Sequence, residues 1–175
     1  MPDATAAGRP RPRPATPGVR TLRAGRTTGI ACVLFLRWLF ALFHLLAAVN
    51  KLRLGWLWSD QLRQVFIERL GELEPGSFAV VFLQSFGIPL YLPIAWVVTV
   101  AEFAVAASLF LGLCTRAGAL LALWLMLMFG IGGYYDASLI ALGAWGALFV
   151  LLPTGHWQGM DRRLHARHPR SLWFR

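Results

Sequence analysis

Four apolar runs dominate the sequence, over residues 29–50, 88–113, 117–135 and 137–154. A helix needs about 20 mainly apolar residues to cross the hydrocarbon core of a bilayer, and each run is close to that length. Hydrophobic residues make up 57% of the chain and charged residues only 14%, whereas an ordinary soluble domain has about 25% charged residues. We therefore predict an all-α integral membrane protein, a bundle of four transmembrane helices.

The connections between these runs predict how the helices are arranged. Only Thr115 and Arg116 separate the second run from the third, and only Asp136 separates the third from the fourth. Such short links require antiparallel neighbours. We predict a disordered basic tail over 1–28, a transmembrane domain over 29–155 and a basic C-terminal tail over 156–175.

The distribution of basic residues predicts the orientation. Twelve of the 17 lysines and arginines lie in the two tails or at Arg116, while residues 51–87 carry as many acidic as basic residues. Because cytoplasmic segments are enriched in lysine and arginine, we expect both termini in the cytoplasm. The net charge of +9 then indicates contact with the lipid bilayer rather than with nucleic acid.

Residues 59–73 predict an amphipathic helix between the first two spans. Ser59 is a suitable N-cap, and apolar residues recur at helical spacing from Leu62 to Leu73. Two placements are open. The helix either lies in the outer membrane interface, or caps the bundle without binding anything.

Charged residues inside the spans are the candidate functional residues, because charge in a membrane persists where it is paired or useful. Arg37, His44 and Lys51 are spaced by seven residues and share one stripe of the first span. Tyr91 and Glu102 share a stripe of small and polar residues in the second.

We expect Arg37 and Glu102 to lie at similar depth and to form a buried ion pair. One interpretation is structural, a pair that holds the two helices together. The other is a polar pocket, in which His44 titrates near neutral pH and Lys51 lies at the outer mouth. No metal-binding or cofactor-binding motif can be recognised, so any cofactor, such as a quinone, would bind without one.

The same residues resemble the DoxX/DoxD family of small bacterial membrane proteins. The resemblance rests on three segments, which run from Arg37 to Leu52, from Ala101 to Arg116 and from Pro153 to Leu164. Arg37, Lys51, Glu102, Arg116 and Asp161 are the matching positions. The chain departs from the family pattern in two places: Ala48 stands where a glycine is common before the lysine, and Thr154 is inserted between Pro153 and Gly155.

The resemblance implies a four-helix bundle in the bacterial inner membrane. Some members are subunits of thiosulfate:quinone oxidoreductase, and others are membrane partners of redox or detoxifying enzymes. We therefore expect a membrane subunit of a quinone-linked oxidoreductase. In this subunit Arg37 and Glu102 would be the catalytic residues. The quinone would be bound by His44, Lys51 and Tyr91. Two alternatives are open: a non-catalytic scaffold that recruits a soluble redox enzyme, and a small-solute or proton carrier, which would need to form an oligomer.

Overall fold

The computed structural model describes residues 17–171, which form helices and no strand. The prediction of an all-α chain is thus confirmed over this part of the protein. Its elements in chain order are α1 (Pro17–Arg53), α2 (Gln61–Glu72), α3 (Phe78–Phe82), a π-helical turn η1 (Leu83–Gly87), α4 (Tyr91–Leu111), α5 (Thr115–Ile131), α6 (Ala137–Leu151), α7 (Thr154–Trp157) and α8 (Asp161–Arg167).

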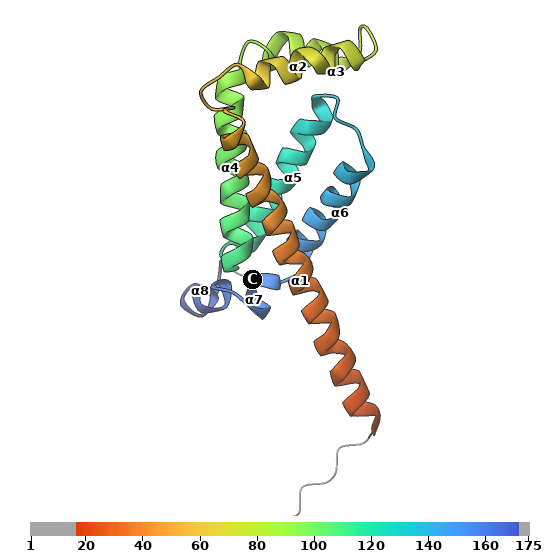
Figure 1. Ribbon diagram of the computed structural model, residues 1–175. Helices are drawn as coiled ribbons and strands as arrows, with labels where there is room; N and C mark the ends of the chain where they lie inside the picture. The colour runs from red at the N-terminus through yellow and green to blue at the C-terminus, as the bar shows by residue number, and fades with distance from the viewer. Residues whose placement is uncertain (1–16, 172–175) are drawn as a thin grey trace, which may run out of the picture.

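Four of these helices run side by side along one axis (Figure 1). α1 packs mainly on α4, α4 on α5, and α5 on α6, so the bundle follows the order of the chain. The tight links before α5 and α6 make these neighbours antiparallel. Fully buried side chains from all four helices form the core, including Phe40, Val105, Leu125 and Phe149.

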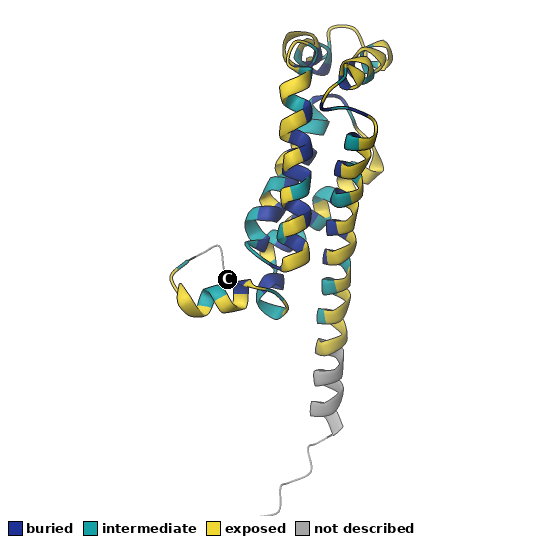
Figure 2. Cartoon of the chain, turned by 60° about the vertical axis from the view of Figure 1, so that its left-hand side comes forward, coloured by how far each residue is buried: buried dark blue, intermediate teal, exposed yellow. Residues whose placement is uncertain are grey.

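Short helices close the two ends of the bundle (Figure 1). We call the end covered by α2, α3 and η1 the loop end, and the end that holds α7 and α8 the tail end. Burial is concentrated along the inner faces of the long helices (Figure 2). Large apolar side chains such as Phe35, Leu46, Leu127 and Ile140 are exposed on the outside.

Two helices are long and apolar enough, by length and composition, to cross a membrane. They are the Thr27–Arg53 part of α1 and all of α4. Residues 78–87, α5 and α6 form shorter apolar helical segments.

The structure adds detail to three of the predicted segments outside the apolar runs. α1 begins at Pro17, so helix replaces part of the tail predicted over 1–28, whereas 1–16 lie outside the described residues. Within the basic C-terminal tail predicted over 156–175, α8 begins at a fully buried Asp161, and residues 172–175 lie outside the described residues. α2 turns its apolar face toward the bundle, where Leu62 and Phe66 are buried, which agrees with the capping alternative for residues 59–73.

The fold of the C-terminal segment depends on Asp161. Its carboxylate accepts hydrogen bonds from Cys114 N at 2.6 Å, Thr115 N at 3.0 Å and Thr115 Oγ1 at 2.8 Å. A carboxylate at the first residues of α5 satisfies backbone N–H groups that the helix leaves without partners, and it interacts favourably with the helix dipole. Asp161 N also donates to Gly112 O at 2.9 Å, which fixes α8 against the end of α4. We call these contacts the C-terminal clasp.

The clasp requires close contact between two glycines. A Cβ atom added to Gly159 would lie 2.6 Å from both the Cα and the carbonyl oxygen of Gly112. Because these are backbone atoms, they cannot move aside as a flexible side chain would.

We therefore predict that Gly159→Ala lowers the stability of the folded chain by about 1–3 kcal/mol, as overpacking does. Gly143→Ala is the matched control, because no atom lies within 4 Å of a Cβ at that position in α6. Thermal unfolding in detergent, followed by circular dichroism, measures both. Equal melting temperatures would contradict the close packing of the clasp.

Candidate functional site

A buried ion pair joins α1 to α4. Lys51 Nζ lies 2.5 Å from Glu102 Oε1 and 2.8 Å from Oε2, and the two residues are 8% and 3% exposed. Lys51 also lies over the ring of Trp56, 5.2 Å from its centroid, in a cation–π contact. Each charge therefore has its compensation inside the protein.

The predicted pairing of Arg37 with Glu102 is not formed. Side chains of a helix lean toward its N-terminus. In the antiparallel pair α1 and α4, Arg37 therefore leans toward the tail end, and Glu102 leans toward the loop end. Lys51 leans from the loop end back toward Glu102, which explains why the lysine takes the place expected for the arginine.

Arg37 binds backbone carbonyls instead of a carboxylate. Its Nη1 donates to Thr154 O and its Nη2 to Gln158 O, each at 2.7 Å. Both acceptors flank α7, so this arginine, only 1% exposed, ties α1 to the C-terminal segment. The contacts of Arg37 are therefore structural, because they join α1 to the C-terminal segment.

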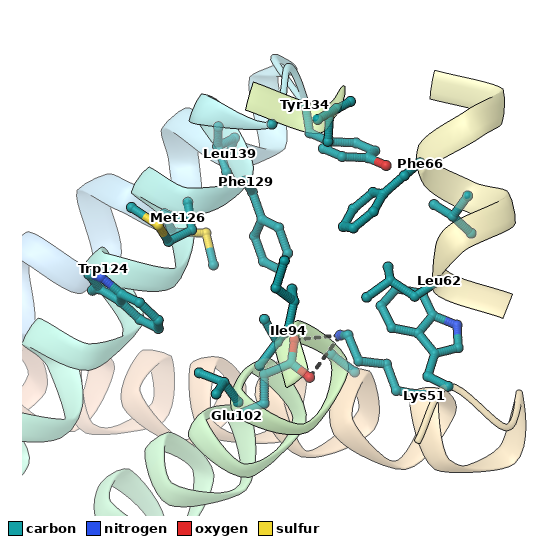
Figure 3. Close-up of a pocket in the computed structure, with 18 of the residues that line it drawn as sticks. Lys51, Leu62, Phe66, Ile94, Glu102, Trp124, Met126, Phe129, Tyr134 and Leu139 are labelled. Atoms are coloured by element: carbon teal, nitrogen blue, oxygen red, sulfur yellow. Dashed lines mark hydrogen bonds and ion pairs between the residues drawn. The ribbon is translucent and has the colours of Figure 1, made fainter. Parts of the chain in front are cut away.

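The ion pair lies in the wall of a cavity of about 540 Å³. Figure 3 shows Lys51 and Glu102 reaching toward each other at one end of the cavity, with Phe66, Phe129 and Tyr134 toward the other. Helices α1, α2, α4, α5 and α6 all contribute lining side chains, and most of these are aliphatic or aromatic. The cavity therefore combines a large apolar volume with one buried pair of charges.

Several lining residues also belong to the exposed surface of the bundle. Leu90 and Val97 of the α4 side are 47% and 52% exposed, Phe43 of α1 is 44% exposed, and Trp124 of α5 is 40% exposed. Exposed apolar side chains at the rim mean that the cavity can be reached across the apolar flank of the bundle.

At the loop end, Arg69 connects α2 to the turn between α5 and α6. Its guanidinium donates to Gly133 O and lies over the ring of Tyr134 at 5.1 Å, and it pairs with Glu72. Asp136 begins α6 and accepts hydrogen bonds from Ser138 Oγ and Leu139 N, which lower the pKa of its carboxyl group. The contacts of Arg69 with Gly133 and Tyr134 hold α2 over the cavity.

Of the five residues predicted for the site, the structure brings two into the cavity wall. Lys51 and Glu102 line it, whereas Arg37, His44 and Tyr91 do not. His44 is buried in the same stripe of α1, and its Nδ1 lies 2.9 Å from Phe40 O. Tyr91 is half-buried and packs near Leu83 and Ala95 instead.

The aromatic lining was not predicted. Trp56, Phe66, Trp124 and Phe129 are spread over three segments, and no local spacing marks them as a group. The apolar face predicted for residues 59–73 was the one feature of the sequence that pointed to this lining, because such a face packs against an apolar surface.

Among the residues that the structure describes, no group of three or more histidine, cysteine or acidic side chains could hold a metal ion. Comparison with protein-family models, with curated proteins and with solved structures finds no match for the chain. The site offers an ammonium donor and a carboxylate, both buried, beside an apolar volume.

The ion pair makes a quantitative prediction. Glu102→Gln or Lys51→Gln leaves one buried charge without its partner, and each change should cost on the order of 3 kcal/mol of stability. The double variant removes both charges and should recover much of that loss. A double-mutant cycle on unfolding free energies in bicelles measures the coupling.

Arg37→Gln provides the matched control for this cycle. Because Arg37 and Glu102 do not meet, their losses should add within about 0.5 kcal/mol. Strong coupling of Glu102 to Arg37, with none to Lys51, would contradict the observed pairing.

Proposed function

We propose that this chain is a multi-pass membrane protein that binds a quinone, and that it serves as the membrane subunit of a quinone-linked oxidoreductase. In this proposal α1, α4, α5 and α6 cross the bacterial inner membrane, with the tail end in the cytoplasm. The observation that carries the quinone assignment is the buried Lys51–Glu102 pair in the wall of an otherwise apolar cavity that is reached from the flank of the bundle.

The exposed flank and the charge distribution support the membrane placement. At 1.5 Å per residue, α4 is about 32 Å long, close to the thickness of a hydrocarbon core. α5 and α6 are shorter, and their connecting turns or local thinning of the bilayer can make up the difference. Exposed acidic residues lie at the loop end, whereas the tail end carries exposed arginines, in agreement with the positive-inside rule.

A quinone suits this cavity chemically. It has a flat ring with two carbonyl oxygens and an apolar isoprenoid tail, and it is dissolved in the membrane. The aromatic lining can pack against the ring, and the tail can leave across the exposed rim at Val97 and Trp124. Lys51 Nζ, Trp56 Nε1 and the Tyr134 hydroxyl belong to residues that line the cavity, and each can donate a hydrogen bond to a carbonyl oxygen.

The Lys51–Glu102 pair also suits the chemistry of quinone reduction. Reduction of a quinone to a quinol takes up two electrons and two protons. The electrons would come from a partner subunit that oxidises the substrate. The Lys51 ammonium, held beside Glu102, can give one proton to a carbonyl oxygen, and solvent supplies the second proton and reprotonates Lys51. The resemblance to the DoxX/DoxD family supports thiosulfate or another reduced sulfur compound as the source of electrons.

The test is purification in a mild detergent followed by solvent extraction and chromatography of the bound quinone. We expect about one quinone per chain. Retention of phospholipid alone would contradict the proposal, and copurification of a soluble redox enzyme without quinone would favour the scaffold alternative.

Variants at two adjacent positions of α1 test whether the quinone binds in the cavity. Ala47 lines the cavity, whereas Leu46 is 58% exposed on the flank. We predict that Ala47→Trp fills the cavity and lowers quinone retention at least about tenfold, a loss of roughly 1.4 kcal/mol. Leu46→Trp should retain quinone, and loss in both variants would place the quinone elsewhere.

A further inference from the structure

The C-terminal clasp buries the carboxylate of Asp161. This carboxylate would otherwise be an exposed negative charge next to the arginines that follow it. Asp161 is fully buried and is bound by Cys114 and Thr115, and among residues 17–171 it is the only carboxylate at the tail end. Arg162 and Arg163 follow it directly and are exposed. Exposed positive charge is thus left without an acidic neighbour.

Arg116 belongs to the same corner of the molecule. It follows Thr115, whose hydroxyl donates to Asp161 Oδ2 at 2.8 Å, so Arg116 and Arg162 each adjoin one member of this hydrogen-bonded pair. The ion pairs found in the described part of the chain are Lys51–Glu102 and Arg69–Glu72, and neither includes a tail-end arginine.

An exposed apolar surface ends at this corner. Phe110 and Leu111, at the end of α4, are 40% and 54% exposed, and Met160 is 45% exposed. Met160 N donates to Leu111 O at 3.2 Å, which brings the start of α8 directly against the end of α4. In both views α8 lies to the side of the bundle at the tail end (Figures 1 and 2).

We propose that the corner between α4, α5 and α8 binds an anionic phospholipid. Arg116, Arg162 and Arg163 face the phosphate of the head group, and the acyl chains lie along Phe110 and Leu111. An amphiphile fits better than an acidic protein, because the positive charge and the exposed apolar side chains adjoin each other. The inference rests on the membrane placement proposed above and is independent of the quinone.

Native mass spectrometry tests the site, with protein in a neutral detergent and an equimolar mixture of phosphatidylglycerol and phosphatidylcholine. We expect the wild-type chain to retain phosphatidylglycerol with a preference of about tenfold. The double variant Arg116→Gln with Arg162→Gln should lose that preference. Arg116→Lys with Arg162→Lys keeps the charge and should keep most of it.

The matched control is Arg53→Gln with Arg63→Gln, which removes two exposed arginines at the loop end and should leave the preference unchanged. An equal loss in both glutamine variants, or no preference in the wild-type chain, would overturn the proposal. Displacement of the lipid by equimolar inorganic phosphate would also overturn it, since the site would then bind free phosphate. Quinone content, measured in parallel, separates failure of this site from failure of the quinone proposal.

Discussion

The buried cations on α1 need polar partners inside an apolar bundle. The contacts that these cations make determine how the other helices pack against α1. Lys51 forms an ion pair with Glu102 of α4, and Arg37 donates hydrogen bonds to the backbone carbonyls of Thr154 and Gln158. The first contact sets the register of α1 against α4, and the second requires the chain after α6 to fold back. An uncompensated charge in either place would cost several kcal/mol.

The separation of these two charges also separates two tasks. Arg37 and Asp161 close the tail end. Arg37 donates a hydrogen bond to the backbone carbonyl of Thr154, and Asp161 accepts one from the backbone N–H of Cys114. Lys51 and Glu102 lie toward the loop end, where the cavity begins. A ligand can therefore interact with the ion pair while the contacts that hold the C-terminal segment stay in place.

Much of the helical architecture could be predicted, because apolar runs and short links leave few alternatives for α4, α5 and α6. Arg37, His44 and Glu102 were predicted inside the spans, and all three are buried. Lys51, predicted at the outer mouth of a pocket, is buried as well, and the burial of Asp161 was not predicted. The pairing of these charged residues could not be predicted from depth alone. Depth compares Cα positions, whereas the opposite lean of side chains on antiparallel helices decides which charged atoms meet.

The burial of Asp161 and the cavity under α2 depend on contacts between residues distant in sequence. Asp161 lies 46 positions from Thr115, and no local pattern links them. Phe66 and Phe129 line the same cavity because α2 packs over the bundle, where Arg69 also donates to Gly133 O. Photolabelling with an azidoquinone, mapped by peptide mass spectrometry, tests the central claim most directly. Our account predicts adducts on cavity residues of α2 and α5, and adducts confined to outward-facing residues such as Phe35 and Ile140 would contradict it.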